Sequence, residues 1–310
     1  MPLKALKKND IVEIVAPGFG CSREDLELGL AYLQRQGFRP RVPQDLFGDC
    51  PIHSNTDEKR AQQLIEALTA PDSKAIWFLR GGYGSNKLLS YLRKIRTKPR
   101  PKMTIGISDI TSLHSFFIQS WGWNTLHGSL LDRLGKGQVP EDVEAELLKV
   151  VRGEQKEVVF QDLVPLNEAA HKQKNIQVVL VGGNLKVIES HVGTREALKL
   201  DDRMVMFEEI GERGYRVDRM LFHLQEARAF KNCKAVVFGS FTHGDEPEGK
   251  ASTIPWVLEN WAGQQSFPVL KGLPCGHDVV QRVLPLGTRA TLKLNPSGTA
   301  TLTVPTGVKK

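Results

Sequence analysis

A serine stands where an apolar segment gives way to a predicted helix. Met103–Ile107 has the composition of a short buried strand, and a helix is predicted from about Asp109 to Ser120, directly after Ser108. Open α/β sheets place their sites at the carboxyl ends of strands, where the first N–H groups of a helix lack partners. Ser108 is therefore a candidate nucleophile, and the backbone N–H of Asp109 is a candidate donor to an oxyanion.

The local sequence leaves a second role open for this serine. Serine is a preferred N-cap residue, and a cap is the commoner use of a serine at such a position. The segment Gly106-Ile-Ser-Asp109 also lacks the final glycine of the Gly-x-Ser-x-Gly motif of α/β hydrolases. From these residues alone, Ser108 is either a nucleophile or an N-cap.

A glycine-rich turn follows the neighbouring predicted strand, Ala75–Leu79. Its sequence is Arg80-Gly-Gly-Tyr-Gly84, which matches neither a Walker loop nor a dinucleotide fingerprint. Glycines let a backbone approach a ligand closely, so the turn could hold a phosphate or supply a second oxyanion donor. A purely structural tight turn is equally compatible with it.

Two carboxylates and one imidazole could complete the chemistry. Glu208 and Glu209 end the predicted strand Met204–Phe207, and His277 lies in a predicted loop. Each is of a type that is usually structural when isolated, but together they supply the base and the orienting carboxylate that a serine nucleophile needs. Cys275 is an alternative nucleophile, although no helix N-terminus is predicted to activate it.

The elements around these residues indicate an α/β protein. In the first half, short apolar strands alternate with amphipathic helices, which is typical of a parallel sheet covered on both faces. The pattern weakens after residue 150, where we expect a linker. The predicted organisation is an N-terminal α/β domain (1–150), a linker (151–175) and a C-terminal domain (176–310) that ends in a hairpin of Arg289–Leu294 and Thr299–Val304.

Composition narrows the classes of function. The net charge is +7, and the basic run Arg93–Lys102 has no interleaved aromatic residues, so a solvated connector is expected rather than a nucleic-acid site. The four cysteines form no Cys-x-x-Cys pair, which disfavours a zinc or redox motif. No apolar run approaches the roughly 20 residues that cross a membrane, and the N-terminus lacks signal-peptide features. We expect a cytoplasmic protein without nucleic-acid or membrane partners.

The order of the motifs resembles a known family. The chain carries Arg80-Gly-Gly-Tyr-Gly84, Gly106-Ile-Ser-Asp109, Gly182-Gly-Asn-Leu185, Met206-Phe-Glu-Glu209 with Tyr215-Arg-Val-Asp-Arg-Met-Leu221, and Gly276-His277. The same order occurs in LD-carboxypeptidases, the S66 serine peptidases, which include microcin C self-immunity peptidases. The resemblance runs from Ile11 to the C-terminal strands.

The resemblance implies a Ser–His–Glu triad of Ser108, His277 and Glu208, with the N–H of Gly82 as second oxyanion donor. The family usually has Glu-Asp where this chain has Glu208-Glu209, so Glu209 competes for the carboxylate role. It also implies a flavodoxin-like or amidotransferase-like N-terminal domain, a smaller C-terminal α/β domain, a site in the cleft between them, and a homodimer.

The implied reaction is hydrolysis of the L–D peptide bond of a murein tetrapeptide, which releases terminal D-alanine in peptidoglycan recycling without a metal or another cofactor. Arg80 and Asn184 are candidate substrate-binding residues, and His127 is a further possible pocket residue. Two alternatives remain: a microcin-type peptidase that cleaves amides of peptidyl or aminoacyl nucleotides, and a non-catalytic muropeptide-binding protein.

Overall fold

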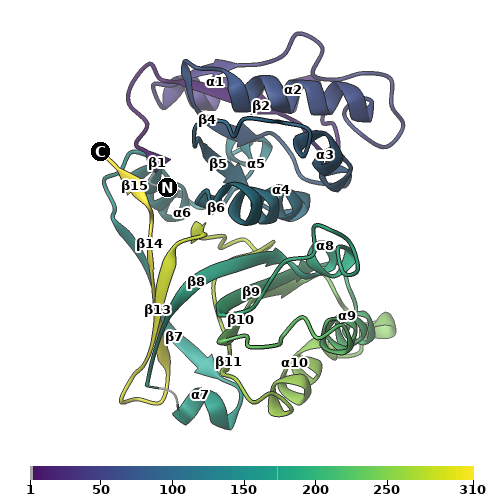
Figure 1. The fold of residues 1–310 in the computed structure, drawn as a ribbon, viewed down its shortest axis with the longest axis vertical. Helices are drawn as coiled ribbons and strands as arrows, with labels where there is room; N and C mark the ends of the chain where they lie inside the picture. The colour runs from purple at the N-terminus through teal and green to yellow at the C-terminus, as the bar shows by residue number, and fades with distance from the viewer. Residues whose placement is uncertain (1–2, 173) are drawn as a thin grey trace. The chain divides into compact units, whose positions relative to one another are not determined.

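The computed structural model describes residues 3–172 and 174–310, and position 173 of the expected linker lies outside the described residues. The chain forms two compact units (Figure 1). Unit 1 comprises Met1–Lys156, Arg282–Pro285 and Thr306–Lys310, and unit 2 comprises Glu157–Gln281 and Leu286–Pro305.

Unit 1 contains a six-stranded sheet in the order β12-β6-β5-β4-β2-β3. The pairs from β3 through β6 are parallel, as the alternation of strands and helices predicts. The strands are β2 (Ile11–Val15), β3 (Arg39–Arg41), β4 (Ser73–Phe78), β5 (Met103–Gly106), β6 (Thr125–His127) and β12 (Leu284–Leu286). The helices are α1 (Arg23–Arg35), α2 (Asp57–Thr69), α3 (Ser85–Leu92), α4 (Thr111–Phe116), α5 (Leu131–Gly135) and α6 (Glu141–Val151).

Helices cover both faces of this sheet. Along β4, Ile76 and Phe78 point into an apolar cluster to which α2, α3 and α4 contribute. Trp77 points to the opposite face, where its ring lies 6.4 Å from that of Tyr32 in α1. The period of two along a strand therefore divides the buried side chains between two helical layers. This confirms the predicted α/β class.

The helix predicted from Asp109 to Ser120 is broken into three parts. A 3-10 turn (Ser108–Ile110) leads into α4, which ends in a π-helical turn (Phe117–Trp121). The ring of Trp121 stacks on that of Phe117 at 5.1 Å, and Gly122 ends the segment at φ 69°. A π-helical turn of this kind is rare, and helix propensity alone does not predict it.

Unit 2 is a closed barrel in the order β10-β11-β7-β14-β13-β8-β9. Strands β8 to β11 pair in parallel, whereas β7, β13 and β14 pair antiparallel with their neighbours. The strands are β7 (Glu157–Pro165), β8 (Asn175–Asn184), β9 (Arg203–Ile210), β10 (Ala235–Thr242), β11 (Val269–Lys271), β13 (Arg289–Leu294) and β14 (Ala300–Pro305). Its helices are α7 (Glu168–Lys172), α8 (Leu185–Ser190), α9 (Gly214–Glu226) and α10 (Ile254–Gly263); α8 and α10 both pack against α9 (Figure 1).

The terminal hairpin is where the sequence predicts it, since β13 and β14 pair antiparallel from Leu294 opposite Ala300. The prediction of a linker at 151–175 is wrong, because this range contains β7, a strand of the barrel. At Asp162 the backbone has φ 59°, and the register with β14 shifts nearby. This bulge interrupts the two-residue alternation by which a strand is recognised.

The expected C-terminal boundary is also corrected. Near the end of the chain, β15 (Val308–Lys309) pairs in parallel with β1 (Leu3–Lys4), and residues 306–310 belong to unit 1. The predicted C-terminal domain therefore ends with β14. A two-residue strand is too short for sequence periodicity to reveal.

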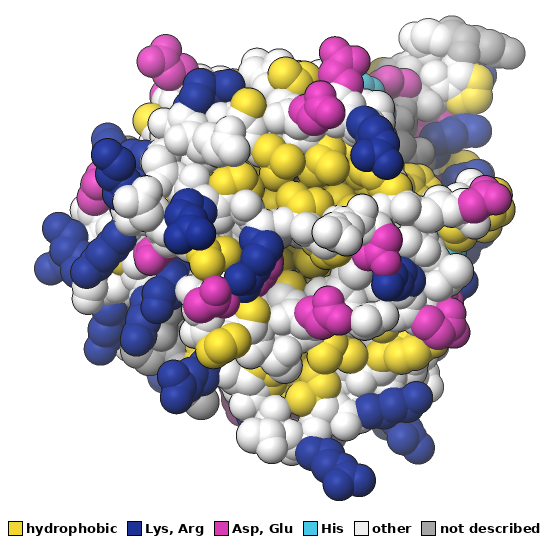
Figure 2. Space-filling view, turned by 90° about the horizontal axis from the view of Figure 1, so that it is seen from above, with side chains coloured by type: hydrophobic (Ala, Val, Ile, Leu, Met, Phe, Trp, Pro, Cys, Tyr) yellow, Lys and Arg dark blue, Asp and Glu magenta, His cyan; other side chains and the backbone are white. Residues whose placement is uncertain are grey.

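The basic surplus lies largely on the surface. In the run Arg93–Lys102, all the cationic side chains are exposed except that of Lys102, which is buried and donates to the carbonyls of Ala67 and Ala70. Figure 2 shows Lys and Arg side chains gathered on one side of the face that it draws, with Asp and Glu among them. Within residues 3–172 and 174–310, no helix has the length and apolar character needed to cross a membrane.

Candidate active site

Ser108 lies at a strained turn between β5 and the helix that follows. Its φ is 68°, in the left-handed region that non-glycine residues seldom occupy. Such a conformation costs on the order of 1–3 kcal/mol and is concentrated at functional sites. The first helical turn uses Ile107 as its N-cap position without a side-chain cap hydrogen bond. Of the two roles that the local sequence leaves open, the conformation favours a displayed hydroxyl over an N-cap, as in the strained strand-to-helix turn of hydrolases.

The glycine turn between β4 and α3 packs directly on this serine. A Cβ atom added to Gly81 would lie 2.8 Å from Cβ of Ser108 and 3.1 Å from its Oγ. Gly82 has φ 91°, and an added Cβ there would meet the ring of Phe19 at 2.2 Å. Only glycine lets the backbone of this turn lie between the serine and the Phe19 ring.

Asp109 ties the serine turn to the start of α3. Its buried carboxylate accepts a hydrogen bond from the backbone N–H of Ser85 at 2.7 Å. The hydroxyl of Ser85 donates in return to the carbonyl of Asp109 at 2.5 Å. Burial raises the pKa of Asp109 to about 6, although the N–H of Ser85 opposes the shift. Ser85 is not among the residues predicted from the sequence, where its signal is its place as the first residue of a helix that follows a glycine.

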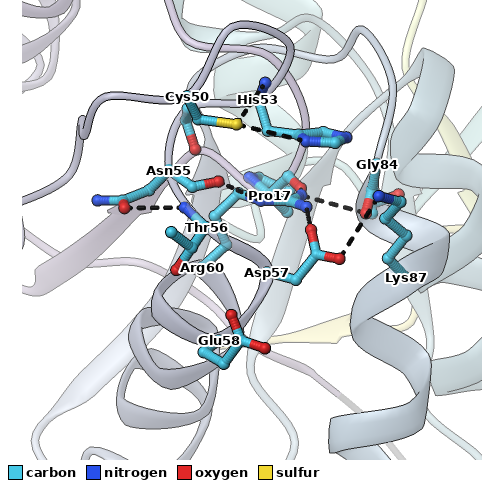
Figure 3. A network of polar contacts seen from close by, with 12 residues as sticks. Pro17, Cys50, His53, Asn55, Thr56, Asp57, Glu58, Arg60, Gly84 and Lys87 are labelled. Carbon is cyan, nitrogen blue, oxygen red and sulfur yellow. Dashed lines mark hydrogen bonds and ion pairs between the residues drawn. The ribbon is translucent and has the colours of Figure 1, made fainter.

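A buried arginine fixes the segments around the glycine turn (Figure 3). The guanidinium of Arg60 donates to the carbonyls of Pro17 and Gly84, the second at 3.1 Å. It also donates to the carbonyl of Asn55 at 3.2 Å and pairs with Asp57. One fully buried cation thus joins the loops after β2, before α2 and before α3.

In unit 2, Glu208 and His277 form a hydrogen-bonded pair. Oε2 of Glu208 lies 2.7 Å from Nδ1 of His277, and the glutamate side chain is fully buried. Gly276 has φ 129°, and an added Cβ would lie 2.8 Å from Cβ of Glu208. The glycine lets the loop that carries the histidine return against the end of β9. The hydroxyl of Thr242 donates to the carbonyl of His277 at 3.1 Å and fixes its backbone.

Glu209 points to a different set of partners. Its Oε1 accepts from Nδ2 of Asn184 at 3.0 Å, and its Oε2 accepts from the backbone N–H of Lys186 at 2.8 Å. Burial raises the pKa of Glu209 to about 7, and the charge of Glu208 adds to the shift. Neighbouring residues on a strand face opposite sides. The register of β9 therefore gives the two glutamates separate roles.

The candidate substrate-binding residues have different surroundings. Asn184 is buried, and besides its bond to Glu209 it caps α8 by accepting from the N–H of Val187 at 3.1 Å. This is a structural use of its amide. Arg80 is partly exposed, and its guanidinium lies 4.0 Å from Asp25. His127 is fully buried in β6, and the thiol of Cys275 is also fully buried.

Ser108, Asp109 and Gly82 thus lie together in unit 1, and Glu208 with His277 in unit 2. Within the described residues, no group of three or more His, Cys, Asp or Glu side chains is arranged to hold a metal ion. Unit 1 presents a strained serine beside glycine backbone, and unit 2 presents an imidazole oriented by a buried carboxylate.

Comparisons with known proteins cover most of the chain. Residues 12–128 match the LD-carboxypeptidase N-terminal domain, and residues 177–292 match the LD-carboxypeptidase C-terminal domain. A murein tetrapeptide carboxypeptidase of Pseudomonas aeruginosa is 30% identical over 296 residues, 92% of this chain and 93% of the relative. The Microcin C7 self-immunity protein MccF of Escherichia coli is 25% identical over 303 residues, 89% of this chain and 88% of the relative.

Among solved structures, the muramoyltetrapeptide carboxypeptidase of Oxalobacter formigenes matches with a TM-score of 0.79 at 25% identity, over 95% of this chain and 98% of that one. The two family domains match the chain in the order that the sequence motifs predict. The chain belongs to the LD-carboxypeptidase family, the S66 peptidases.

Proposed function

We propose that this protein is a serine LD-carboxypeptidase that releases terminal D-alanine from murein tetrapeptides in peptidoglycan recycling. The observation that carries the proposal is the 2.7 Å contact between Glu208 and Nδ1 of His277. A buried carboxylate on one ring nitrogen is the arrangement that makes an imidazole a base for a serine. The 30% identity to a murein tetrapeptide carboxypeptidase supports the choice of substrate.

The first step is attack by Ser108. Because Glu208 holds the proton on Nδ1 of His277, Nε2 is the atom that takes the proton of the serine hydroxyl. The negative carboxylate then stabilises the imidazolium that forms. This chemistry requires Nε2 of His277 to reach the hydroxyl of Ser108 in the working enzyme.

The oxyanion that develops on the scissile carbonyl needs donors near Ser108. In the proposal these are the backbone N–H groups of Asp109 and Gly82. Each such donor is worth about 3–4 kcal/mol in the transition state. The position of Gly81 supports this assignment, because there is no room for a side chain between the glycine turn and the nucleophile.

Collapse of the tetrahedral intermediate breaks the L–D peptide bond. The imidazolium of His277 gives its proton to the leaving amine of D-alanine, and the tripeptide remains as an ester on Ser108. Water, deprotonated by the same imidazole, then hydrolyses the ester. Arg80 is proposed to bind the terminal carboxylate of the substrate, since it is a partly exposed cation at the glycine turn.

A second candidate function is a peptidase of the microcin self-immunity type, favoured by the 25% identity to MccF. The full chain should be assayed on a murein tetrapeptide and on an aminoacyl sulfamoyl adenylate. We expect kcat/KM for D-alanine release from the tetrapeptide to be at least about tenfold higher than kcat/KM for cleavage of the adenylate. A tenfold ratio corresponds to a difference of about 1.4 kcal/mol in transition-state binding. The opposite preference would favour the second candidate.

Binding of the tetrapeptide without release of D-alanine would instead favour a non-catalytic muropeptide-binding protein. The proposed enzyme acts in the cytoplasm as a homodimer. Sedimentation analysis of the purified chain tests the dimer, and fractionation of the native cell tests the compartment.

A further inference from the structure

A pocket of about 600 Å³ opens in unit 1 beside the glycine turn. It contains two of the four cysteines of the chain, both of them partly exposed. Its lining includes Phe19, Cys21, Phe47, Cys50, Ile52 and His53. The proposed peptidase chemistry uses none of these side chains.

Cys50 has the surroundings of a reactive thiol. Its Sγ accepts a hydrogen bond from the backbone N–H of His53 at 3.4 Å and lies 3.8 Å from Nδ1 of the same residue (Figure 3). The N–H groups of Ile52 and His53 lower the pKa of the Cys50 thiol, and the cation of Arg60 adds to them against the opposing charge of Asp57. These groups stabilise a thiolate, the reactive form of cysteine.

The imidazole of His53 lies beside the sulfur of Cys50. Its side chain is 8% exposed, and within the described residues its Nε2 has no hydrogen-bond partner. Burial lowers the pKa of His53, and the cations of Arg60 and Lys87 lower it further. The imidazole is therefore neutral at pH 7, so the thiolate of Cys50 is held by the backbone N–H of His53 and not by an imidazolium.

Cys21 shares the pocket but has the opposite environment. Burial raises the pKa of its thiol to about 12, and the charges of Asp132 and Asp25 raise it further. Such a thiol stays protonated and unreactive at neutral pH. Cys21 therefore serves as the control for Cys50 when the thiols of this pocket are labelled.

We infer that Cys50 is a site of reversible modification by low-molecular-weight disulfides, with the backbone N–H of His53 stabilising the thiolate. The thiolate of Cys50 attacks one sulfur of the disulfide and forms a mixed disulfide. The S–S bond of the reagent breaks, and its other half leaves as a thiolate. The proton of the partly exposed Cys50 thiol passes to solvent, and an added thiol reverses the reaction.

Modification of Cys50 should impair the proposed active site by displacing the glycine turn. The backbone N–H of Phe19 donates to the carbonyl of Gly81 at 2.9 Å, and the His53 ring lies 5.5 Å from that of Tyr83. A group bound to Cys50 fills the pocket between Phe19 and His53 and displaces the two residues that support this turn. This second part rests on the proposed function, whereas the labelling of Cys50 does not.

The test uses dithiobis(nitrobenzoate), an aromatic disulfide, on the native full-length chain at pH 7. Peptide mapping by mass spectrometry should find the first label on Cys50, at least about tenfold faster than on Cys21, because thiolate fraction sets the rate. Cys50→Ser should lose the fast phase of thionitrobenzoate release, and Cys21→Ser should keep it. His53→Gln keeps the backbone N–H that binds Sγ and should keep the fast phase at pH 7. Labelling of Cys21 at the rate of Cys50, or a fast phase that survives in Cys50→Ser, would overturn the inference.

The link to activity has a separate readout. D-alanine release should fall in proportion to the label on Cys50 and return after reduction, while Cys50→Ser should be active and insensitive to the reagent. Full activity of the labelled protein would refute the link to the glycine turn and leave the reactive thiol established. Absence of D-alanine release before labelling would count against the proposed function alone.

Discussion

Glu208 and His277 lie 69 residues apart in the sequence, yet their side chains meet at 2.7 Å. The neighbouring carboxylate of Glu209 is bound instead by Asn184 and by the N–H of Lys186. Strand β9 therefore carries two buried glutamates with different roles. Glu208 orients an imidazole, and Glu209 secures the start of α8.

This division predicts unequal effects of isosteric substitution. Glu208→Gln removes the charge that stabilises the imidazolium and disturbs the tautomer, so kcat should fall by about 10³–10⁴-fold. Glu209→Gln should lower kcat by less than about tenfold, because its partners hold α8 and not the imidazole. Steady-state kinetics of D-alanine release distinguish the two, and equal losses would refute the assignment.

Glu209 also predicts a pH dependence of stability. Burial raises its pKa to about 7 from an ordinary 4.5. The stability that a raised folded-state pKa contributes is complete below the unfolded value and is lost as the pH rises through the folded value. Between pH 5 and pH 8, the free energy of unfolding of the wild type, measured in urea, should fall by up to about 3 kcal/mol relative to that of Glu209→Gln. Parallel pH profiles for the two proteins would show that Glu209 does not titrate in this range.

The contact between the glycine turn and the serine predicts that Gly81→Ala is damaging. An added Cβ would lie 2.8 Å from Cβ of Ser108, so the turn must shift away from the nucleophile. A displacement of this size should lower kcat by about 10²-fold. Gly263→Ala is the matched control, since nothing beyond its chain neighbours and the backbone of its own helix lies within 4 Å of its added Cβ, and it should have wild-type kinetics. Unchanged kcat in Gly81→Ala would show that the turn takes no part in the reaction.

The buried guanidinium of Arg60 predicts a large loss of stability on its removal. Arg60→Met leaves the buried carbonyls of Pro17 and Gly84 without their donor and breaks the pair with Asp57. The free energy of unfolding of the protein should fall by about 3–5 kcal/mol. Arg96→Met, at an exposed position, should change it by less than about 0.5 kcal/mol. Urea denaturation followed by circular dichroism measures both, and similar values for the two variants would contradict this role of Arg60.

The sequence was sufficient to predict the elements whose local signals agree with the packing. α1 begins after Ser22, a preferred N-cap residue whose hydroxyl accepts from the N–H of Asp25, and β13 and β14 form the predicted terminal hairpin. The closed barrel was not predictable, because the bulge at Asp162 hides the periodicity of β7. Closure also depends on pairing between strands that lie far apart in the sequence.

The candidate site was predictable in part. Motif order points to Ser108, Glu208 and His277, but the choice between Glu208 and Glu209 depends on which face of β9 each occupies. A shift of one residue in register would exchange them. The left-handed backbone of Ser108 is likewise a product of the packed turn, since the residue type does not favour it.

The most direct test of the account is the rate of D-alanine release from murein tetrapeptide by Ser108→Ala. Without the hydroxyl no acyl-enzyme can form, and the rate should fall by about 10³-fold or more, to what the oxyanion donors and binding alone sustain. Circular dichroism and tetrapeptide binding should match those of the wild type. Release of D-alanine by Ser108→Ala at the wild-type rate would contradict the central claim that Ser108 is the nucleophile.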